Sequence, residues 1–522
     1  MTTGQQELRT NRRTFAGKAV STGARYREIV SILSRHGLGF LVDSVQEGRP
    51  AETAPEHVRL ALEELGPTFV KLGQLLSTRG DLLPPEYVAE LAKLQDAAPP
   101  VPAEAIRAVV AEELGSGFEE AFETFDLEPL AAASIGQAHA ATLHDGTEVV
   151  VKVRRPGAVE QVEQDLEILR NLAARAVRHS QTAAEYDAVG LADEFARTLR
   201  AELDYLTEGR NADRFANNFE DEPSIRIPRL YWETTTSRVL TLERIRGIKV
   251  SDLDALDAAG IDRHAVAERA TRATAKMVFD DGFFHADPHP GNFFVQDDGV
   301  IGVIDFGMVG SIDERLRGQL GEVLVAFTRG DADRLTDAVL ELGVAQAAVD
   351  RAALSRDVGE FLQRYADVGV GEISLEQVIG EILAIVRRHR LRLPSDLALL
   401  LRVLVMDQGL AAALDPSFLV QDELVPYARR LVSQETAPEV LAQRLAQAGQ
   451  DAAQLGVELP EQARRLLHTA EAGDLQVRLH ADDLEPLATR VERVGNRLVA
   501  AVLVSSLVQA AAVVAGRRRR RQ

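Results

Sequence analysis

One short stretch near the middle of the chain constrains the fold more than any other part of the sequence. It runs from His285 to Asn292 (HADPHPGN) and is followed, thirteen positions later, by Asp305-Phe306-Gly307. The residues between them read as a strand at 293–295, a turn at 298–299 and a second strand at 300–304. We therefore expect a short β-hairpin that carries polar groups from both of its flanks to the same end.

This layout resembles the catalytic loop and metal-binding turn of protein kinases. Those enzymes carry an H-R-D-x-x-x-x-N loop followed by D-F-G, in which the first Asp orients the acceptor while the Asn and the second Asp hold Mg²⁺. The resemblance implies that Asp287 accepts or orients the acceptor proton and that Asn292 and Asp305 bind the metal. Single residues of these types are more often turn or cap residues, but the shared spacing favours the catalytic interpretation.

Composition excludes several other classes of protein. With 522 residues, 46% of them hydrophobic and 27% charged, the chain is typical of a folded globular protein with two or three domains. A net charge of −21 argues against nucleic acid as a partner, because a phosphate backbone requires a basic surface. Without cysteine, the chain forms neither disulfides nor thiolate metal sites. Its polar N-terminus lacks the apolar core of a secretion signal.

A second strand-turn-strand pattern, upstream of the loop, resembles the start of a kinase N-lobe. It consists of Ala140–Leu143 and Glu148–Val153. Lys152 lies in the second of these strands, where a kinase lysine contacts the nucleotide phosphates. Glu243, at the end of a later expected strand, is a further candidate for nucleotide binding. The partner of Lys152 should be a helical glutamate, and spacing leaves three candidates open: Glu202, Glu163 and Glu167.

Two departures from ordinary protein kinases bear on the acceptor. The first is Ala286, which replaces the arginine that binds the phosphate of the activation loop in many kinases. The second is a helical pattern that begins near Asp313 and leaves no room for a long activation segment. The glycine-rich phosphate loop is replaced by an alanine-rich segment, and alanine resists the positive φ values that glycine adopts freely. A stiffer loop is therefore expected, and its candidate nucleotide-binding residues are Ala131, Ala132, Ala133, Ser134 and Gln137.

Five motifs follow one another along the chain: Lys71-Leu72-Gly73-Gln74, the alanine-rich segment, Glu202-Leu203-Asp204, the loop from His285 to Asn292, and Asp305-Phe306-Gly307. Taken in this order, they resemble the motifs of the UbiB/ADCK/AarF family of atypical protein-kinase-like proteins over roughly residues 25–420. The resemblance implies an α+β, predominantly helical protein with a bilobal kinase-like fold, an N-terminal helical K-x-G-Q extension and a C-terminal helical tail.

The same resemblance implies a function. ATP and Mg²⁺ would be the cofactors of an ATPase or unorthodox kinase that supports ubiquinone or menaquinone biosynthesis, with lipid or isoprenoid quinone precursors as partners. The K-x-G-Q helix would cover the place where a protein substrate docks, with Lys71 and Gln74 pointing into the active site. Glu202 and Asp204 would help to hold Lys152 or Lys71.

The motifs and helical periodicities divide the chain into five parts. We expect an N-terminal helical extension over 1–98, an N-lobe with inserted helices over 103–245, a helical C-lobe over 246–425 and a helical tail over 426–490. The inserted helices should include long ones at 159–178 and 191–214.

The last part is an uncharged stretch, Leu498–Gly516, with arginines on both sides. It approaches the roughly 20 apolar residues that span a bilayer, and the arginines favour anionic headgroups. We expect it to attach the protein to the membrane at the cytoplasmic face, since an ATP-using domain must face the cytoplasm. Packing of this segment on the protein or within a homo-oligomer is the alternative.

Two other functions fit the same loop. Small-molecule kinases of the aminoglycoside- and choline-kinase-like type use a comparable H-x-D-x-H-x-x-N pattern and also lack a peptide-docking segment. A nucleotide-sensing pseudokinase scaffold, in which turnover is incidental, would keep the same ATP site. The motifs therefore leave the acceptor open among water, a lipid, a metabolite and a protein.

Overall fold

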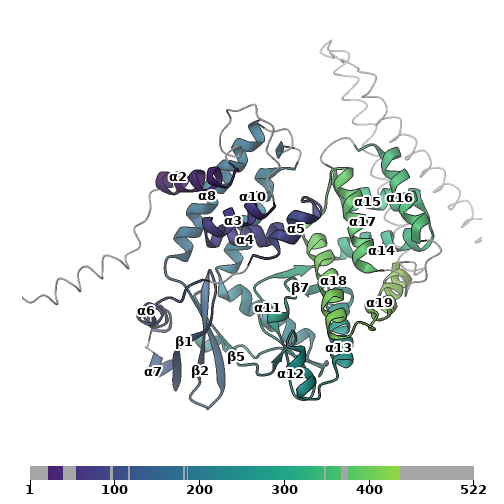
Figure 1. Cartoon of the computed structure of the whole chain (residues 1–522). Coiled ribbons are helices and arrows are strands. Elements are labelled where there is room, and N and C mark those ends of the chain that lie inside the picture. The colour runs from purple at the N-terminus through teal and green to yellow at the C-terminus, as the bar shows by residue number, and fades with distance from the viewer. Residues whose placement is uncertain are drawn as a thin grey trace, which may run out of the picture. The chain divides into compact units, whose positions relative to one another are not determined.

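The computed structural model describes residues 22–38, 55–94, 98–115, 118–179, 183–184, 186–345, 349–365 and 374–435. The chain divides into two compact units after Val432, and the structure described below is that of the first unit (Figure 1). The expected membrane segment at 498–516 and the expected tail from 436 onward lie outside the described residues. The boundaries expected within the first unit remain predictions.

The N-terminal extension consists of short helices whose apolar faces meet in one cluster. They are α2 (Thr22–Arg35), α3 (Pro55–Leu65), α4 (Pro67–Leu76) and α5 (Pro85–Leu91). Ile29, Leu62 and Phe69 are buried where three of these helices meet. Gly66, with a φ of 96°, turns the chain between α3 and α4, a conformation that glycine adopts without strain. The extension thus has a core of its own.

A four-stranded antiparallel sheet in the order β1-β2-β3-β5 forms the N-lobe. Its strands are β1 (Thr124–Ala132), β2 (Gly136–Thr142), β3 (Glu148–Arg154) and β5 (Val239–Glu243), and the helices α6 (Ala103–Leu114) and α7 (Phe118–Ala121) precede them. Val149, Val151 and Val153 of β3 are fully buried in a cluster with α6. Because side chains alternate along a strand, Lys152 points to the other face of the sheet.

Strand β1 corrects the expectation for the alanine-rich segment. Ala131 and Ala132 are the last residues of β1 and pair with β2, and only the residues from Ala133 to Ile135 form the connecting turn. The strand was not predicted from the sequence, although exposed and half-buried residues alternate from Thr124 to Leu130, because none of its residues is fully buried and Pro129 interrupts the run.

Inserted helices lie between β3 and β5 in the part of the chain that the structure describes. They are α8 (Ala158–His179), α10 (Ala188–Glu202) and α11 (Tyr205–Asn218). The expected single helix over 191–214 is wrong, because the chain breaks at Leu203-Asp204. Asp204 has an extended backbone, and its carboxylate accepts a hydrogen bond from Leu206 N at 3.1 Å, so it caps α11. Before the break α10 packs against α8, whereas after it α11 packs against β5.

In the C-lobe, the expected hairpin forms the two central strands of a small four-stranded sheet. Strands β8 (Phe293–Val295) and β9 (Ile301–Val303) form this hairpin, as the sequence predicted. They are flanked by β6 (Ile248–Lys249) and β4 (Ile225–Arg226), in the order β4-β9-β8-β6. A separate pair, β7 (Phe283–His285) and β10 (Val309–Ser311), brackets the hairpin, with His285 opposite Val309. The loop after His285 and the turn before Val309 are therefore held side by side.

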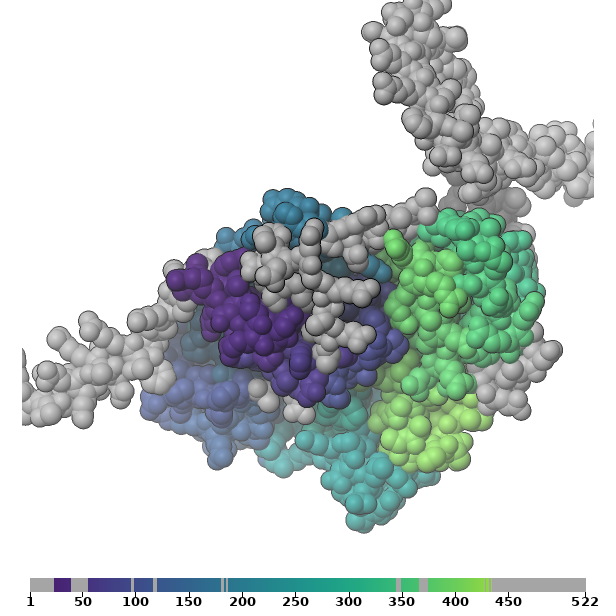
Figure 2. All heavy atoms as spheres, turned by 45° about the horizontal axis from the view of Figure 1, so that its top comes forward, coloured from purple at the N-terminus to yellow at the C-terminus, as the bar shows by residue number. Residues whose placement is uncertain are grey.

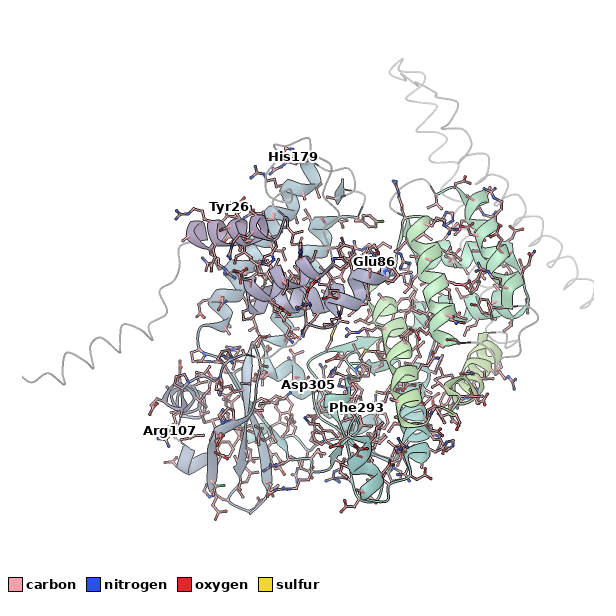
Figure 3. The ribbon with its side chains drawn as sticks, in the orientation of Figure 1. Tyr26, Glu86, Arg107, His179, Phe293 and Asp305 are labelled. Carbon is pink, nitrogen blue, oxygen red and sulfur yellow. The ribbon has the colours of Figure 1, made fainter. Side chains whose placement is uncertain are left out.

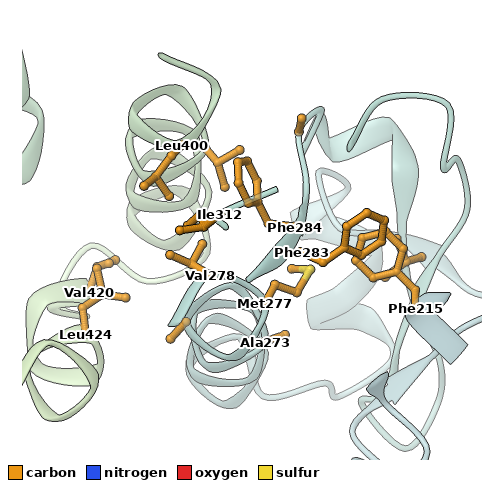
Figure 4. Close-up of a cluster of buried hydrophobic side chains, with 14 of the residues drawn as sticks. Phe215, Ala273, Met277, Val278, Phe283, Phe284, Ile312, Leu400, Val420 and Leu424 are labelled. Atoms are coloured by element: carbon orange, nitrogen blue, oxygen red, sulfur yellow. The ribbon is translucent and has the colours of Figure 1, made fainter. Parts of the chain in front are cut away.

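Helices cover these strands and complete the C-lobe. Figure 4 shows part of their core, in which Phe283 and Phe284 of β7 pack among residues from several helices, including Leu400. The remaining elements are α12 (Leu253–Ala258), α13 (Arg263–Ala275), a π-helical turn (Lys276–Asp280), α14 (Glu314–Thr328), α15 (Ala332–Leu342), α16 (Arg351–Tyr365), α17 (Leu375–Arg388), α18 (Ser395–Leu414), α19 (Val420–Glu435), the strand pair β11 (Val344–Ala345) and β12 (Leu391–Arg392), and the 3₁₀ turns Trp232–Thr234 and Pro290–Asn292.

Helix α18 is the one helix among the described residues that is long and apolar enough to cross a membrane, with a mean hydropathy of 1.8. It packs against α13 and α17. Leu397, Leu400 and Val403 are buried in the main core of the unit, and the helix also carries Arg402 and Asp407. These contacts and charges are those of the core helix of a folded domain.

Asp407 should make the stability of the protein depend on pH. One of its carboxylate oxygens accepts a hydrogen bond from Thr274 Oγ1 at 3.1 Å, and the other has no partner among the described residues. Burial raises the pKa of Asp407 from 3.8 to about 6. Between these two values the folded protein binds a proton that the unfolded chain has released, so the free energy of unfolding falls as the pH rises through this interval.

We therefore expect Asp407→Asn to stabilise the protein at pH 8 and to leave it nearly unchanged at pH 4. A shift of about two pKa units corresponds to about 3 kcal/mol as an upper value. Denaturant unfolding at the two pH values measures the difference, with Asp422→Asn on the exposed face of α19 as the matched control. Parallel pH profiles for wild-type protein and Asp407→Asn would contradict this interpretation.

Candidate active site

Three charged side chains from distant parts of the sequence meet where the N-lobe sheet faces the C-lobe. Lys152 Nζ of β3 lies 2.5 Å from Glu208 Oε1 of α11 and 3.1 Å from Asp305 Oδ2. Figure 3 shows Asp305 between the N-lobe strands and the helical C-lobe. Side-chain exposure is 46% for Asp305 but 8% for Glu208. Glu208 is therefore the structural partner of Lys152, whereas Asp305 is open to a ligand.

The three groups tune each other's protonation. Burial acts to lower the pKa of Lys152, but Asp305 and Glu208 outweigh it and raise that pKa above its usual value. Burial acts to raise the pKa of Asp305, but Lys152 and the Gly307 N–H bring it down to about 2. Lys152 is thus held as a cation and Asp305 as an anion at neutral pH. These are the states that phosphate contact and metal binding require.

None of the three glutamates proposed from the sequence pairs with Lys152. Glu202 lies 3.1 Å from Lys71, Glu163 pairs with Arg200, and Glu167 is exposed. The reason is the break before α11, which starts a new helix whose first turns face β3. The signal was present in the sequence, because an Asp before an apolar-periodic segment is an N-cap residue. Interpreting Asp204 in this way, rather than as a lysine partner, would have indicated Glu208.

Helix α11 also fixes the backbone of Asp305-Phe306-Gly307. Glu208 Oε1 accepts a hydrogen bond from Phe306 N at 3.3 Å, and Asn211 Nδ2 donates to Phe306 O at 2.9 Å. The ring of Phe306 is completely buried and lies 5.4 Å from the ring of Phe215 on the same helix. One helix therefore holds both β3 and the turn that carries Asp305.

The loop from His285 to Asn292 is joined to the same turn through His285. Burial lowers the pKa of His285, so its ring is neutral. Nδ1 accepts a hydrogen bond from Asp287 N at 3.2 Å, which leaves Nε2 to donate to the carbonyl oxygen of Asp305. Asn292 Nδ2 donates to Asp287 O at 3.1 Å. The positions of Asp287, Asn292 and Asp305 are thus mutually fixed.

Asp287, Asn292 and Asp305 all line one cavity of about 470 Å³. Of the other predicted site residues, Lys71, Gln74, Ala133 and Glu202 also line it. Side chains from α4, α5 and α10 complete the walls, so the extension contributes directly to the cavity. The side chains on its remaining walls include Leu75, Leu91, Leu94, Phe195, Thr198, Leu199, Met308 and Arg402.

Several predicted nucleotide-binding residues do not line this cavity: Ala131, Ala132, Ser134, Gln137, Lys152, Asp204 and Glu243. Lys152 nevertheless contacts the cavity residue Asp305 at 3.1 Å. Gln137 is opposite Val153 on the α6 face of the sheet, and its amide oxygen accepts a hydrogen bond from Val101 N. Glu243 lies 2.6 Å from Arg226. In both cases the side chain is committed to a structural contact away from Lys152, and these two expectations are corrected.

Helix α4 covers the cavity and is fitted closely to its neighbours. Lys71 pairs with Glu202, and Gln74 Nε2 donates to Leu94 O at 3.2 Å. A Cβ atom at Gly73 would overlap Leu94 Cδ1 and lie 2.8 Å from Leu62 Cδ1. The glycine of the K-x-G-Q motif therefore permits the close packing of α4 on α3 and on the residues after α5.

A buried group of charges, which we call the clasp, joins the end of α4 to the C-lobe. It comprises Arg79, Asp81, Glu194 and Leu393. The Arg79 guanidinium donates to both carboxylate oxygens of Asp81 at 2.9 and 2.8 Å, and Asp81 accepts a hydrogen bond from Leu393 N at 3.1 Å. Glu194 lies 3.4 Å from Arg79. Figure 2 shows the extension (purple to violet) against the C-terminal helices (green). No local pattern in the sequence indicates the clasp, because Glu194 and Leu393 are far from Arg79 and Asp81 in the chain.

The donor set suits a magnesium-bound nucleotide. The Asp305 carboxylate and the Asn292 amide oxygen are the hard oxygen ligands that Mg²⁺ takes, and this ion commonly completes its shell with phosphate oxygens and water. The described part of the chain holds no group of three or more His, Cys, Asp or Glu side chains that could bind a metal alone. The Asp305 and Asn292 oxygens fit an ion that also takes phosphate oxygens as ligands.

This arrangement of sheet, lysine–glutamate pair, catalytic loop and metal-binding turn defines a protein-kinase-like protein. Residues 93–339 match the ABC1 atypical kinase-like domain, and residues 358–419 match the UbiB helical domain. The chain belongs to the ABC1/UbiB family of atypical kinases. Both the family resemblance and the predicted fold class are thereby confirmed.

Relatives cover most of the chain. The probable protein kinase UbiB of Xylella fastidiosa is 35% identical over 87% of this chain and 83% of its own length. The chloroplastic protein ACTIVITY OF BC1 COMPLEX KINASE 8 of Arabidopsis thaliana is 36% identical over 86% of this chain and 64% of its own length. A solved structure of a Mycobacterium tuberculosis protein in complex with erythromycin is 27% identical, covers 68% of this chain and 90% of that one, and has a TM-score of 0.46.

Proposed function

We propose that this protein binds ATP with Mg²⁺ at Lys152, Asn292 and Asp305 and hydrolyses it or transfers its terminal phosphoryl group. The observation that carries the proposal is the contact of Lys152 with both Glu208 and Asp305 beside a cavity that Asp287 also lines. The bond from the terminal phosphorus to its bridging oxygen breaks, and a bond from phosphorus to the acceptor oxygen forms. Asp287 takes the acceptor proton, and ADP leaves.

The surroundings of the cavity favour a small or lipid-like acceptor, or water, over a peptide. Helix α4 covers the cavity, and α14 begins at Glu314 with Asp313 as its N-cap, soon after Asp305. The few residues between them form β10 rather than a peptide-docking segment. Both features argue against the docking of an extended peptide near Asp287.

The cellular role that we propose is support of isoprenoid quinone biosynthesis or lipid handling at the cytoplasmic face of a membrane. The family membership supports this role, since one relative bears the name UbiB. The uncharged segment 498–516 with its flanking arginines supports attachment to anionic lipid. Lipid or quinone precursors would then reach the protein from the membrane.

Two measurements test this proposal. Calorimetry on the full-length protein should show ATP binding that weakens at least about tenfold when EDTA replaces Mg²⁺, because two of the proposed ligands act through the metal. Lipidomics of a deletion strain should show altered quinone pools, restored by wild-type protein but not by Asp287→Asn. Unchanged pools in the deletion strain would remove the quinone role. Full rescue by an inactive Asp287→Asn protein would instead indicate a nucleotide-sensing scaffold.

A further inference from the structure

Arg402 of α18 lines the catalytic cavity, although no sequence motif pointed to it. Its guanidinium carries five N–H donors, and 22% of its side chain is exposed. Its contact with a charged group is with Asp287 Oδ1 at 4.0 Å, which is the outer limit for an ion pair. Among the described residues, none accepts a hydrogen bond from the Arg402 guanidinium, so its donors are available on the cavity side.

The other basic side chains that the structure describes around this cavity are already closely paired. Lys152 has Glu208 at 2.5 Å, and Lys71 has Glu202 at 3.1 Å. Lys93 has Glu90 at 2.5 Å. Arg402 is therefore the cation of the cavity with the weakest existing pairing. Burial lowers the pKa of Arg402, which means that its charge is poorly solvated. A bound anion would relieve that cost.

From this placement, and resting on the proposed function, we infer that Arg402 binds the terminal phosphate of the nucleotide. The planar guanidinium matches two phosphate oxygens at once. Arg402 also lies beside Asp287, the group that takes the acceptor proton, and this is where the phosphoryl group passes to the acceptor. Charge spreads over the non-bridging oxygens during transfer, so a cation at this point accelerates the reaction as well as binding the ground state.

A different role for Arg402 would be to hold the Asp287 side chain in place without touching the nucleotide. The two roles predict different binding. An arginine on the terminal phosphate discriminates a nucleoside triphosphate from a diphosphate, whereas an arginine that only positions Asp287 changes turnover and leaves that discrimination intact. The ratio of the two affinities therefore separates the roles without relying on activity.

The experiment compares wild-type protein, Arg402→Ala and Arg402→Lys with Mg²⁺ and either ADP or the β,γ-imido analogue of ATP. We expect Arg402→Ala to weaken binding of the triphosphate analogue about tenfold or more and to leave ADP binding within about twofold. Turnover should fall about a hundredfold or more, and Arg402→Lys should recover part of both losses. The matched control is Arg388→Ala on α17, whose guanidinium is exposed and pairs with Asp357; both affinities should stay at wild-type values.

The outcomes separate this inference from the proposed function. If Arg402→Ala leaves the triphosphate-to-diphosphate affinity ratio unchanged, the inference is overturned, even where wild-type protein binds and hydrolyses ATP. If wild-type protein binds nucleotide but shows no turnover, the proposed chemistry fails, and the affinity ratio still decides the role of Arg402. If wild-type protein binds no nucleotide, both fall together. Unchanged melting temperatures exclude a folding defect as the cause of any loss.

Discussion

Asp305→Asn is expected to reduce Mg²⁺-dependent ATP turnover about a thousandfold or more and to make nucleotide binding insensitive to EDTA. Asparagine removes the charge that neutralises the metal. It also removes the anion 3.1 Å from Lys152, which then has Glu208 as its remaining charged partner. The amide oxygen of asparagine can still accept the hydrogen bond from Gly307 N, so the turn should keep its shape. The loss should therefore be one of metal binding rather than folding.

Titration of ATP binding and hydrolysis with Mg²⁺ checks this expectation. Asp298→Asn is the matched control, because Asp298 is an exposed carboxylate in the turn of the same hairpin and accepts a hydrogen bond from Val300 N. The control should behave like wild-type protein. If Asp305→Asn keeps a normal Mg²⁺ dependence, the metal site has been assigned to the wrong residue.

Arg79→Ala should produce the largest loss of stability. Arg79 is 3% exposed and Asp81 is fully buried, so the substitution leaves a buried carboxylate whose main partner is the N–H of Leu393. Breaking a buried ion pair by removing one partner costs about 3–5 kcal/mol. Because the clasp fixes the end of α4, hydrogen exchange should also accelerate in α4 and α5. Denaturant unfolding and exchange mass spectrometry measure the two effects.

The comparison for Arg79→Ala is Arg200→Ala. Arg200 is 51% exposed and makes two hydrogen bonds to Glu163 on the surface, and exposed pairs of this kind contribute less than about 1 kcal/mol. Similar losses in the two variants would show that the clasp is no stronger than a surface contact. In that case it would not anchor α4.

The features that were predicted correctly from the sequence depend on residues that are close together in the chain. The loop and hairpin from His285 to Gly307 rest on local spacing and turn residues, and the structure has the hairpin where it was expected. Glu208 was missed because its role depends on a helix break that a single residue, Asp204, creates. Strand β1 was missed because none of its residues is fully buried and Pro129 interrupts it. Local patterns identify helices and strands, but a single capping residue can end one helix and start another, which changes the side chains that face the neighbouring strand.

Arg402 and the clasp show a different limit. Arg402 is more than a hundred residues from Asp287 in sequence, and Asp81 is joined to Leu393 across most of the unit. Nothing in the local pattern of α18 distinguishes Arg402 from an ordinary helix-surface arginine. Gln137 is the opposite case, since its motif context indicated a ligand, whereas the register of β2 turns it toward α6. Such contacts are set by the packing of whole elements.

The position of the clasp has a mechanical consequence. Leu393, which receives Asp81, is two residues before Ser395, where α18 begins, and Ser395 Oγ donates to Glu194 of the clasp. The same rigid helix presents Arg402 to the cavity two turns later. A movement of α4 away from the cavity would therefore pull on the start of α18, the helix that carries Arg402. If binding of an acceptor required that movement, the acceptor would lower the affinity of the protein for the nucleoside triphosphate. The triphosphate would in turn lower the affinity for the acceptor by the same factor.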